Sequence, residues 1–347
     1  MRLSSASREA RTVGLCALVL PVLLAGCSGS VEVAEPEAAA PTSPAGQANA
    51  SITILTTNAA DVVGPGPPSQ GEWSFSAWVE VEGRSFLFDT GWSPRNVLAN
   101  AEVLGIDLSQ AEDLVLSHHH RDHTGGLETL RAELSRRNPR ALSRIHVAQG
   151  MFASRPWPDG SEGNPMIAVR DRIEATGAEF IIHDQPAEIA PDVWLTGPVE
   201  RIHDERNYTS GPDRVVVQDG ATVPDVVPES QSLVILSPEG PIVVSGCGHA
   251  GLINTLECVR TRISDHPPQA AIGGFHLFGA SDEVLGWTAE RLAEMQLGNF
   301  VGAHCTGFES VYRIRELAGM NRERARVGAI GTRYETGRGV VAGRVNR

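Results

Sequence analysis

Residues 116–126 read Leu-Ser-His-His-His-Arg-Asp-His-Thr-Gly-Gly, and the rest of the chain is organised around them. An apolar run at residues 113–116 leads into this stretch and predicts a short buried strand. Successive side chains of a strand point to opposite faces, so His118 and His120 point the same way. His119 faces away from them by the same rule, and we interpret it as a structural residue.

The chain then turns, and the turn adds Asp122 and His123 to the two strand histidines. Gly125 and Gly126 let the backbone leave tightly before a helical pattern at residues 127–134. Three imidazoles and a carboxylate therefore meet at one strand end, and these groups are ligands of zinc, iron and manganese. The stretch predicts a divalent-metal site. The alternative is an accidental surface cluster of histidines or a His-rich loop that merely attracts metal.

Two segments of the C-terminal third carry further side chains of the same kind. Cys247 and His249 lie between a predicted strand and a predicted helix, and both thiolate and imidazole bind metal. We favour His249 as the ligand; ligation by Cys247 and a plain helix-capping turn are the alternatives. His276 and His304 each follow a predicted strand. For His276 the sequence leaves a ligand, a substrate contact and a core residue open.

Five short motifs follow one another in a fixed order. They are Phe-Asp-Thr-Gly at 88–91, Ser-His-x-His-x-Asp-His-Thr-Gly-Gly at 117–126, Gly-Cys-x-His-Ala-Gly at 246–251, Gly-Gly-Phe-His-Leu at 273–277 and His-Cys-Thr-Gly at 304–307. The series resembles the metallo-β-lactamase superfamily over most of residues 51–334. Within that superfamily it is similar to the branch named after the dihydropterin–ribofuranosylaminobenzene 5'-phosphate synthase of methanopterin biosynthesis.

The resemblance implies an α/β fold, a four-layer αββα sandwich, with one or two divalent ions. Zinc is the first expectation, with iron or manganese as alternatives. The implied ligands are His118, His120 and His249 for one ion and Asp122, His123 and His304 for the other. Asp89 would accept a hydrogen bond from a ligand histidine; the alternative is an aspartate that caps a turn. Superfamily members often place a bridging aspartate where this chain has Cys247, so the bridge between two ions departs from the common pattern here.

The implied chemistry is hydrolysis. Bound metal would lower the pKa of a water molecule and polarise the acyl or phosphoryl oxygen of the substrate, while Asp122 could also orient the nucleophile. We therefore predict a metal-dependent hydrolase whose partner is a small-molecule substrate: a phosphate ester, a lactone or an amide. A dihydropterin-type transferase that releases pyrophosphate, and a non-catalytic envelope protein that binds a ligand, are the alternatives. The oligomeric state is left open.

The first residues predict export. A positive segment is followed by a short apolar run at residues 13–24, too short for an ordinary membrane-spanning helix. Leu-Ala-Gly-Cys at residues 24–27 resembles a bacterial lipobox, which implies cleavage before Cys27 and a lipid on its sulfur, hence a membrane anchor at the bacterial envelope. A plain secretory signal cut nearby is the alternative. The predicted organisation is a signal peptide at 1–26, a flexible tether at 27–50, and a domain at 51–347 with an insertion at about 151–230.

Composition narrows the class of protein further. The chain has 347 residues, of which 41% are hydrophobic, and this suits one large α/β domain or two small ones. The net charge of −13 does not indicate a nucleic-acid-binding surface. Five cysteines do not suggest a disulfide framework. Strands are expected at 51–57, 75–81, 85–88, 113–116, 145–147, 180–182, 232–236, 241–245, 270–274, 300–303 and 326–330, and helices at 96–104, 127–134, 252–263, 283–295 and 309–317.

Overall fold

Two β-sheets lie face to face at the centre of the protein in a computed structural model that describes residues 46–61, 68–205, 214–341 and 343. The first sheet contains β1 (Ala50–Thr56), β2 (Ser76–Val81), β3 (Arg84–Phe88), β4 (Asp113–Val115), β5 (Arg144–Ala148), β6 (Glu179–His183), β16 (Arg333–Glu335) and β17 (Gly339–Val341). The second contains β7 (Ala187–Ala190), β8 (Val193–Leu195), β11 (Ser232–Ser237), β12 (Gly240–Ser245), β13 (Ala270–Gly273), β14 (Asn299–Gly302) and β15 (Ala325–Val327). Their orders are β17-β16-β1-β2-β3-β4-β5-β6 and β15-β14-β13-β12-β11-β8-β7.

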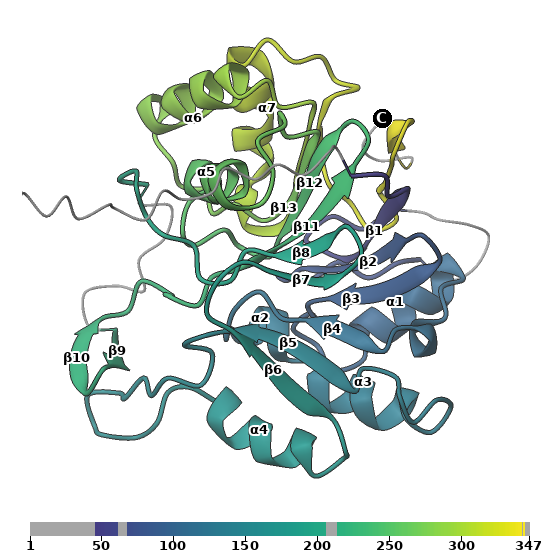
Figure 1. The fold of residues 1–347 in the computed structure, drawn as a ribbon, viewed down its shortest axis with the longest axis vertical. Helices are drawn as coiled ribbons and strands as arrows, with labels where there is room; N and C mark the ends of the chain where they lie inside the picture. The colour runs from purple at the N-terminus through teal and green to yellow at the C-terminus, as the bar shows by residue number, and fades with distance from the viewer. Residues whose placement is uncertain (1–45, 62–67, 206–213, 342, 344–347) are drawn as a thin grey trace, which may run out of the picture. The chain divides into compact units, whose positions relative to one another are not determined.

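Helices cover the outer face of each sheet (Figure 1). The first sheet is covered by α1 (Asn96–Leu104), α3 (Leu127–Leu134) and α4 (Met166–Glu174), and the second by α5 (Leu252–Arg262), α6 (Asp282–Glu294) and α7 (Phe308–Leu317). Short elements complete the fold: α2 (Arg121–Thr124), the 3-10 helices Leu108–Gln110 and His304–Thr306, and the hairpin β9 (Val215–Gln218) and β10 (Ala221–Pro224). The expected four-layer αββα sandwich is confirmed.

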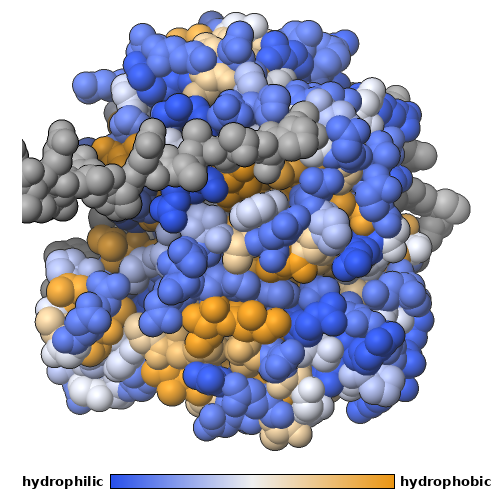
Figure 2. Space-filling model, in the orientation of Figure 1, coloured by the Kyte–Doolittle hydropathy of each residue, from blue (hydrophilic) through white to orange (hydrophobic). Residues whose placement is uncertain are grey.

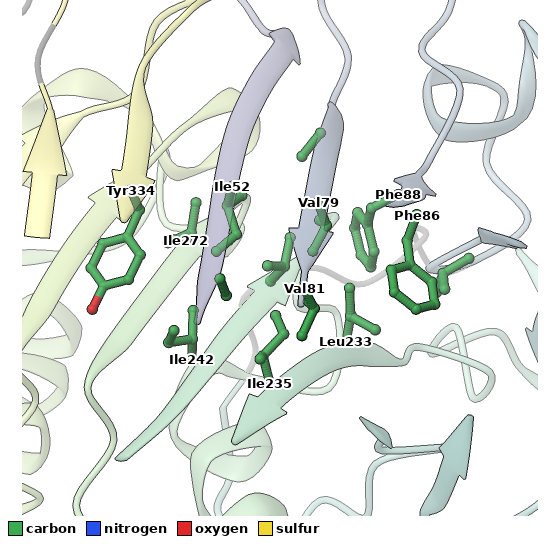
Figure 3. Packing of buried hydrophobic residues seen from close by; sticks show 14 of the residues in the cluster. Ile52, Val79, Val81, Phe86, Phe88, Leu233, Ile235, Ile242, Ile272 and Tyr334 are labelled. Atoms are coloured by element: carbon green, nitrogen blue, oxygen red, sulfur yellow. The ribbon is translucent and has the colours of Figure 1, made fainter. Parts of the chain in front are cut away.

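The space between the sheets is filled by side chains that alternate along each strand. Val79 and Val81 of β2 point inward and face Leu233 and Ile235 of β11 (Figure 3). Trp78, the residue before Val79, points to the opposite face and joins the cluster under the helices. Burial of one such aliphatic side chain stabilises the fold by about 1.5–3 kcal/mol, so the two-residue period holds the sandwich together.

The loops that bear the sequence motifs follow parallel strands. β3, β4, β5 and β6 run parallel to one another, as do β12, β13, β14 and β15. Parallel strands present their carboxyl ends at one edge of a sheet, where α/β proteins place their sites. The histidine stretch follows β4, and the three C-terminal motifs follow β12, β13 and β14.

Two parts of the chain differ from the sequence prediction. In the predicted insertion at about 151–230 only the strand at 180–182 was expected, but α4 packs on β6, and β7 and β8 extend the second sheet. No strand was predicted after residues 326–330, but β16 pairs with β1, and β17 pairs with β16. Each of these strands has only three or four residues, so a period of two has little room to appear.

The surface seen in Figure 2 is mostly hydrophilic, with an apolar area in its lower half over the region of β6. β6 is the last strand of the first sheet, and its Ile182 is 43% exposed. Within the described part of the chain, no helix has the length and apolar character needed to cross a bilayer. The predicted signal peptide, the lipid site Cys27 and most of the tether lie outside the described residues.

Candidate metal centre

His118 and His249 face each other across the two sheets. Their Nε2 atoms are 3.1 Å apart, and both side chains are buried. His118 follows β4, whereas His249 follows β12. On its other side, the Nδ1 atom of His118 lies 2.9 Å from the Ser117 hydroxyl, which fixes the orientation of the ring. The Cys247 thiol completes a group of three donor atoms that lie within 4.8 Å of one another.

A second group of donors comprises Asp122, His123, Cys247 and His304. The Asp122 carboxylate lies 3.2 Å from the Nε2 atom of His304 and 3.6 Å from the Nε2 atom of His123. The Nε2 atom of His123 is also 3.1 Å from the Cys247 sulfur. Cys247 therefore belongs to both groups.

The Asp89 carboxylate fixes both the histidine loop and the His123 ring by hydrogen bonds. One of its carboxylate oxygens accepts the backbone N–H of Ser117 at 2.7 Å. The other accepts the Ser117 hydroxyl at 2.7 Å and lies 2.7 Å from the Nδ1 atom of His123. The bond to Nδ1 leaves the Nε2 atom of His123 directed at the donor group. Gly246 passes so close that a Cβ there would collide with the Asp89 carboxylate and the Ser117 hydroxyl.

A third set of donors consists of Cys247, His276 and Cys305. The two sulfurs are 3.3 Å apart, and the Cys305 sulfur accepts the backbone N–H of His276 at 3.3 Å. The His276 ring lies 4.6 Å from the ring of His249, measured between centroids. His276 therefore lies next to His249 of the first donor group. From this position it can serve as a metal ligand or contact a substrate.

His119 belongs to none of the donor groups among the described residues, as predicted, although β4 ends at Val115 and the three histidines lie in the loop that follows it. Its Nδ1 atom lies 2.6 Å from Glu229, which also accepts the backbone N–H of His119 at 3.3 Å. The second carboxylate oxygen of Glu229 accepts a 2.6 Å bond from Arg155, and Arg155 donates in turn to Asp225 at 3.0 Å. All four residues are buried. Arg155 near the start of the predicted insertion, and Asp225 and Glu229 near its end, therefore bind the histidine loop through His119.

The burial of the site separates the charge states of its residues. Burial, followed by repulsion among neighbouring imidazoles, lowers the pKa of His118 and of His249 well below the usual value for histidine. Burial alone would also lower the pKa of His123, but Asp122 and Asp89 raise it to about 9. Burial would raise the pKa of Asp122, but His123 and His304 lower it. In the absence of metal, His118 and His249 are therefore neutral, whereas His123 and Asp122 form an imidazolium–carboxylate pair.

The structure brings most of the predicted site residues together. His118, Asp122, His123, His249 and His304 lie in the first two donor groups, together with Cys247, which the sequence left as an alternative. The ring of His120 lies 4.6 Å from that of His118 and 5.0 Å from that of His249, yet His120 belongs to none of the donor groups found among the described residues. Glu229 and Arg155 were missed, because a single charged residue in a loop carries no periodic signal.

The geometry of both groups suits a divalent ion. Zinc–nitrogen bonds of about 2.0–2.1 Å in a tetrahedral arrangement place two ligand atoms about 3.3–3.4 Å apart. The His118–His249 and Asp122–His304 separations of 3.1 and 3.2 Å come close to that spacing. Without a metal between them, the Nε2 atoms of two imidazoles that face each other have two choices. Their lone pairs repel, or the two atoms share a single proton. Imidazole, carboxylate and thiol together form a donor set for zinc, iron or manganese.

A four-layer αββα sandwich with histidine-rich donor groups at its strand ends defines a metal-binding α/β protein. The sequence profile of the Metallo-beta-lactamase superfamily matches residues 74–249. The chain therefore belongs to the metallo-β-lactamase superfamily.

Two relatives from Methanocaldococcus jannaschii extend the likeness beyond the matched profile. One is 7,8-dihydropterin-6-methyl-4-(β-D-ribofuranosyl)-aminobenzene-5'-phosphate synthase, 28% identical over 283 residues, which are 80% of this chain and 95% of the relative. The other is an uncharacterised protein, 26% identical over 246 residues, which are 70% of this chain and 87% of the relative. The resemblance to the synthase branch, predicted from the five motifs, is thereby confirmed.

One solved structure is similar over nearly its whole length. It is a metal-dependent hydrolase of the β-lactamase superfamily with 25% identity and a TM-score of 0.62; the match covers 82% of this chain and 98% of that one. The same fold is therefore shared with a protein described as a hydrolase and, through the sequence, with a protein described as a synthase.

Proposed function

We propose that the protein is a metal-dependent hydrolase that acts on a phosphate ester, a lactone or an amide of a small molecule. The observation that carries the proposal is the pair of buried donor groups, His118 with His249 and Asp122 with His123 and His304, joined at Cys247. When bound there, a divalent metal supplies Lewis acidity and an activated water. The similarity to a metal-dependent hydrolase of the same superfamily supports this choice.

The chain's own residues would divide the work. The neighbouring histidines lower the pKa of Asp122, whose side chain is 14% exposed, so its carboxylate can orient the attacking water. Asp89 holds His123 by the Nδ1 atom and keeps the Nε2 atom available as a ligand. The buried walls around His118 and His249 exclude bulk water and strengthen the electrostatic interactions within the site.

Transfer rather than hydrolysis is the second candidate, favoured by the similarity to the dihydropterin-type synthase over 80% of the chain. The experiment is product analysis of the metal-loaded protein with phosphate esters, lactones and amides in one arm and pterin pyrophosphates with an amine acceptor in the other. Hydrolysis that stops on chelation and returns with zinc, manganese or iron supports the proposal. Acceptor-dependent release of pyrophosphate would replace it. Metal without turnover in either arm would favour a ligand-binding protein.

We also propose that the protein works at the bacterial envelope, held by a lipid on Cys27. The support is the sequence of residues 1–50 alone: a positive start, a short apolar run, Leu-Ala-Gly-Cys and a tether rich in Ala, Pro, Ser and Glu. Several acyl chains anchor a protein stably, whereas one chain does so only marginally. Its site would then meet substrates outside the cytoplasm.

A further inference from the structure

The third donor group, Cys247 with His276 and Cys305, converges from the ends of three neighbouring strands. Each of the three residues follows one of β12, β13 and β14, which run parallel and pair in that order. All three side chains are buried. Their donor atoms, two sulfurs and one imidazole nitrogen, lie within 4.8 Å of one another. The sheet itself therefore places this group, at the edge where α/β proteins build their sites.

The separation of the two sulfurs suits a shared ion better than a disulfide bond. The sulfurs of Cys247 and Cys305 lie 3.3 Å apart. A disulfide bond is about 2.05 Å long, whereas two sulfurs bound at about 2.3 Å to one tetrahedral ion lie about 3.8 Å apart. An ion therefore requires the sulfurs to move apart by about 0.5 Å, and a disulfide requires them to approach by about 1.25 Å.

Each sulfur has a nitrogen donor beside it that would stabilise a thiolate. The backbone N–H of His276 donates to the Cys305 sulfur at 3.3 Å, and the Nε2 atom of His123 lies 3.1 Å from the Cys247 sulfur. The thiolate is the form of cysteine that binds metal, and hydrogen bonds to a charged form favour it. His276 is held at a φ of 44°, which is uncommon for a residue other than glycine. A Cβ at Gly274 would lie only 2.8 Å from the Cys305 sulfur, so glycine leaves room for it.

Two sulfurs and one imidazole make a softer donor set than either of the first two groups. The first group combines two imidazoles with one sulfur, and the second adds a carboxylate. Soft thiolate ligands select Cu(I), zinc and iron–sulfur clusters, whereas carboxylates suit harder ions. A structural zinc site almost always has four ligands, whereas three are sufficient for Cu(I). Among the thiophilic ions, a single Cu(I) therefore fits this group best.

The third group shares Cys247 with the other two, so its occupation affects them. If the Nε2 atom of His123 donates its proton to the Cys247 thiolate, that nitrogen has no lone pair left for a divalent ion. Cu(I) in the third group and a divalent ion in the second group therefore exclude each other.

We propose that the third donor group binds one Cu(I) ion and that this ion displaces the divalent ion from the second group. Cu(I) replaces the protons of the two thiols, which pass to solvent, and no electron is transferred. The inference concerns metal binding alone and stands apart from the proposed function, because neither hydrolysis nor transfer enters it.

The test titrates the full-length, zinc-loaded protein with Cu(I) in the absence of oxygen, in competition with a chromophoric Cu(I) chelator. We expect one Cu(I) per chain and the release of about one equivalent of zinc. Cys305→Ser should keep its zinc, because Cys305 belongs to neither of the first two groups. It should bind Cu(I) at least about 100-fold more weakly, the upper end of the loss caused by changes to a ligand's partners. The matched control is Cys258→Ser, which removes the half-buried cysteine of α5 and should keep wild-type Cu(I) affinity.

X-ray absorption at the copper edge of the wild type decides the inference even if Cys305→Ser does not fold. We expect two sulfur neighbours and one nitrogen neighbour per copper. Fewer than two sulfurs, no Cu(I) bound in competition with the chelator, or equal affinity in Cys305→Ser and the wild type would overturn the inference. Copper that binds without release of zinc would overturn the displacement. Turnover by the zinc form tests the proposed function separately, since the copper measurements do not depend on it.

Discussion

Replacement of Asp89 by asparagine should weaken metal binding without a change in side-chain size. The Asp89 carboxylate satisfies three donors at 2.7 Å: the Ser117 N–H, the Ser117 hydroxyl and the Nδ1 atom of His123. Asparagine offers one oxygen and two N–H groups. Its oxygen can keep the Ser117 N–H, but its N–H₂ then faces the hydroxyl and the imidazole. The hydroxyl can rotate to accept, whereas His123 must present an unprotonated Nδ1.

That change of tautomer puts the ring proton on the Nε2 atom, where the metal would bind. A hydrogen bond to a charged group contributes about 1.5–3 kcal/mol. Loss of such a partner of a ligand histidine costs about 10–100-fold in metal affinity, which agrees with that energy. Asp89→Asn should therefore bind zinc at the His123 group about 10–100-fold more weakly than the wild type, measured by competition with a chromophoric chelator.

A matched control lies at the start of β4, the strand that leads into the histidine loop. Asp113 begins β4 and contacts the Nε2 atom of His146 at 3.0 Å, so Asp113→Asn also breaks an aspartate–histidine pair. This control should lose stability, as seen in its unfolding midpoint, but keep wild-type zinc affinity. Equal affinity in Asp89→Asn and the wild type, or equal losses in both variants, would refute the role given to Asp89.

Four further predictions concern the charge of His123, the buried ion cluster and the location of the protein. Metal binding at His123 should release one proton at about pH 7, because the pKa of about 9 keeps the metal-free imidazole charged there. Above about pH 10 the imidazole is already neutral, and no proton should be released. Calorimetry in buffers of different ionisation enthalpy measures the number of protons released. In the metal-free protein the same raised pKa stabilises the fold below about pH 6.5, and the gain is lost as the pH rises through about 9. Glu229→Gln removes one of the two buried counter-charges of Arg155, the other being Asp225, and should lower the free energy of unfolding by up to about 3–5 kcal/mol in chemical denaturation. A loss below about 1 kcal/mol would contradict the role of the ion cluster. Cys27→Ala should release the protein from membranes or block its maturation, so unchanged fractionation together with a wild type that takes up no lipid label would remove the anchor from the account.

The sequence predicted long, strongly patterned elements well. β1, β2, β11 and β12 each hold six or seven residues, enough for their buried runs to stand out. The helix at Asn96–Leu104 was predicted with its bounds, since Gly105 ends it in the left-handed conformation that glycine adopts readily. The three-residue strands β16 and β17 were not predicted, because their place beside β1 is decided by tertiary pairing.

The site was predictable only in part. The spacing in residues 117–126 places the strand histidines on one side, and the structure shows His119 on the other, bound to Glu229. Pairs between loops that follow different strands, such as His118 with His249 or Cys247 with Cys305, join residues more than fifty positions apart. No local pattern encodes such a distance. A cavity of about 680 Å³ likewise brings together residues 203–205, His276 and the start of α6, which are far apart in the sequence.

The most direct test of the account is a crystal structure of the metal-loaded protein with anomalous diffraction recorded at the absorption edge of the bound metal. The account predicts one peak between the Nε2 atoms of His118 and His249 and, where a second ion binds, another among Asp122, His123 and His304. Cys247 should lie beside both positions. Peaks elsewhere, or none in a protein that elemental analysis shows to be loaded with metal, would contradict the assignment of this centre.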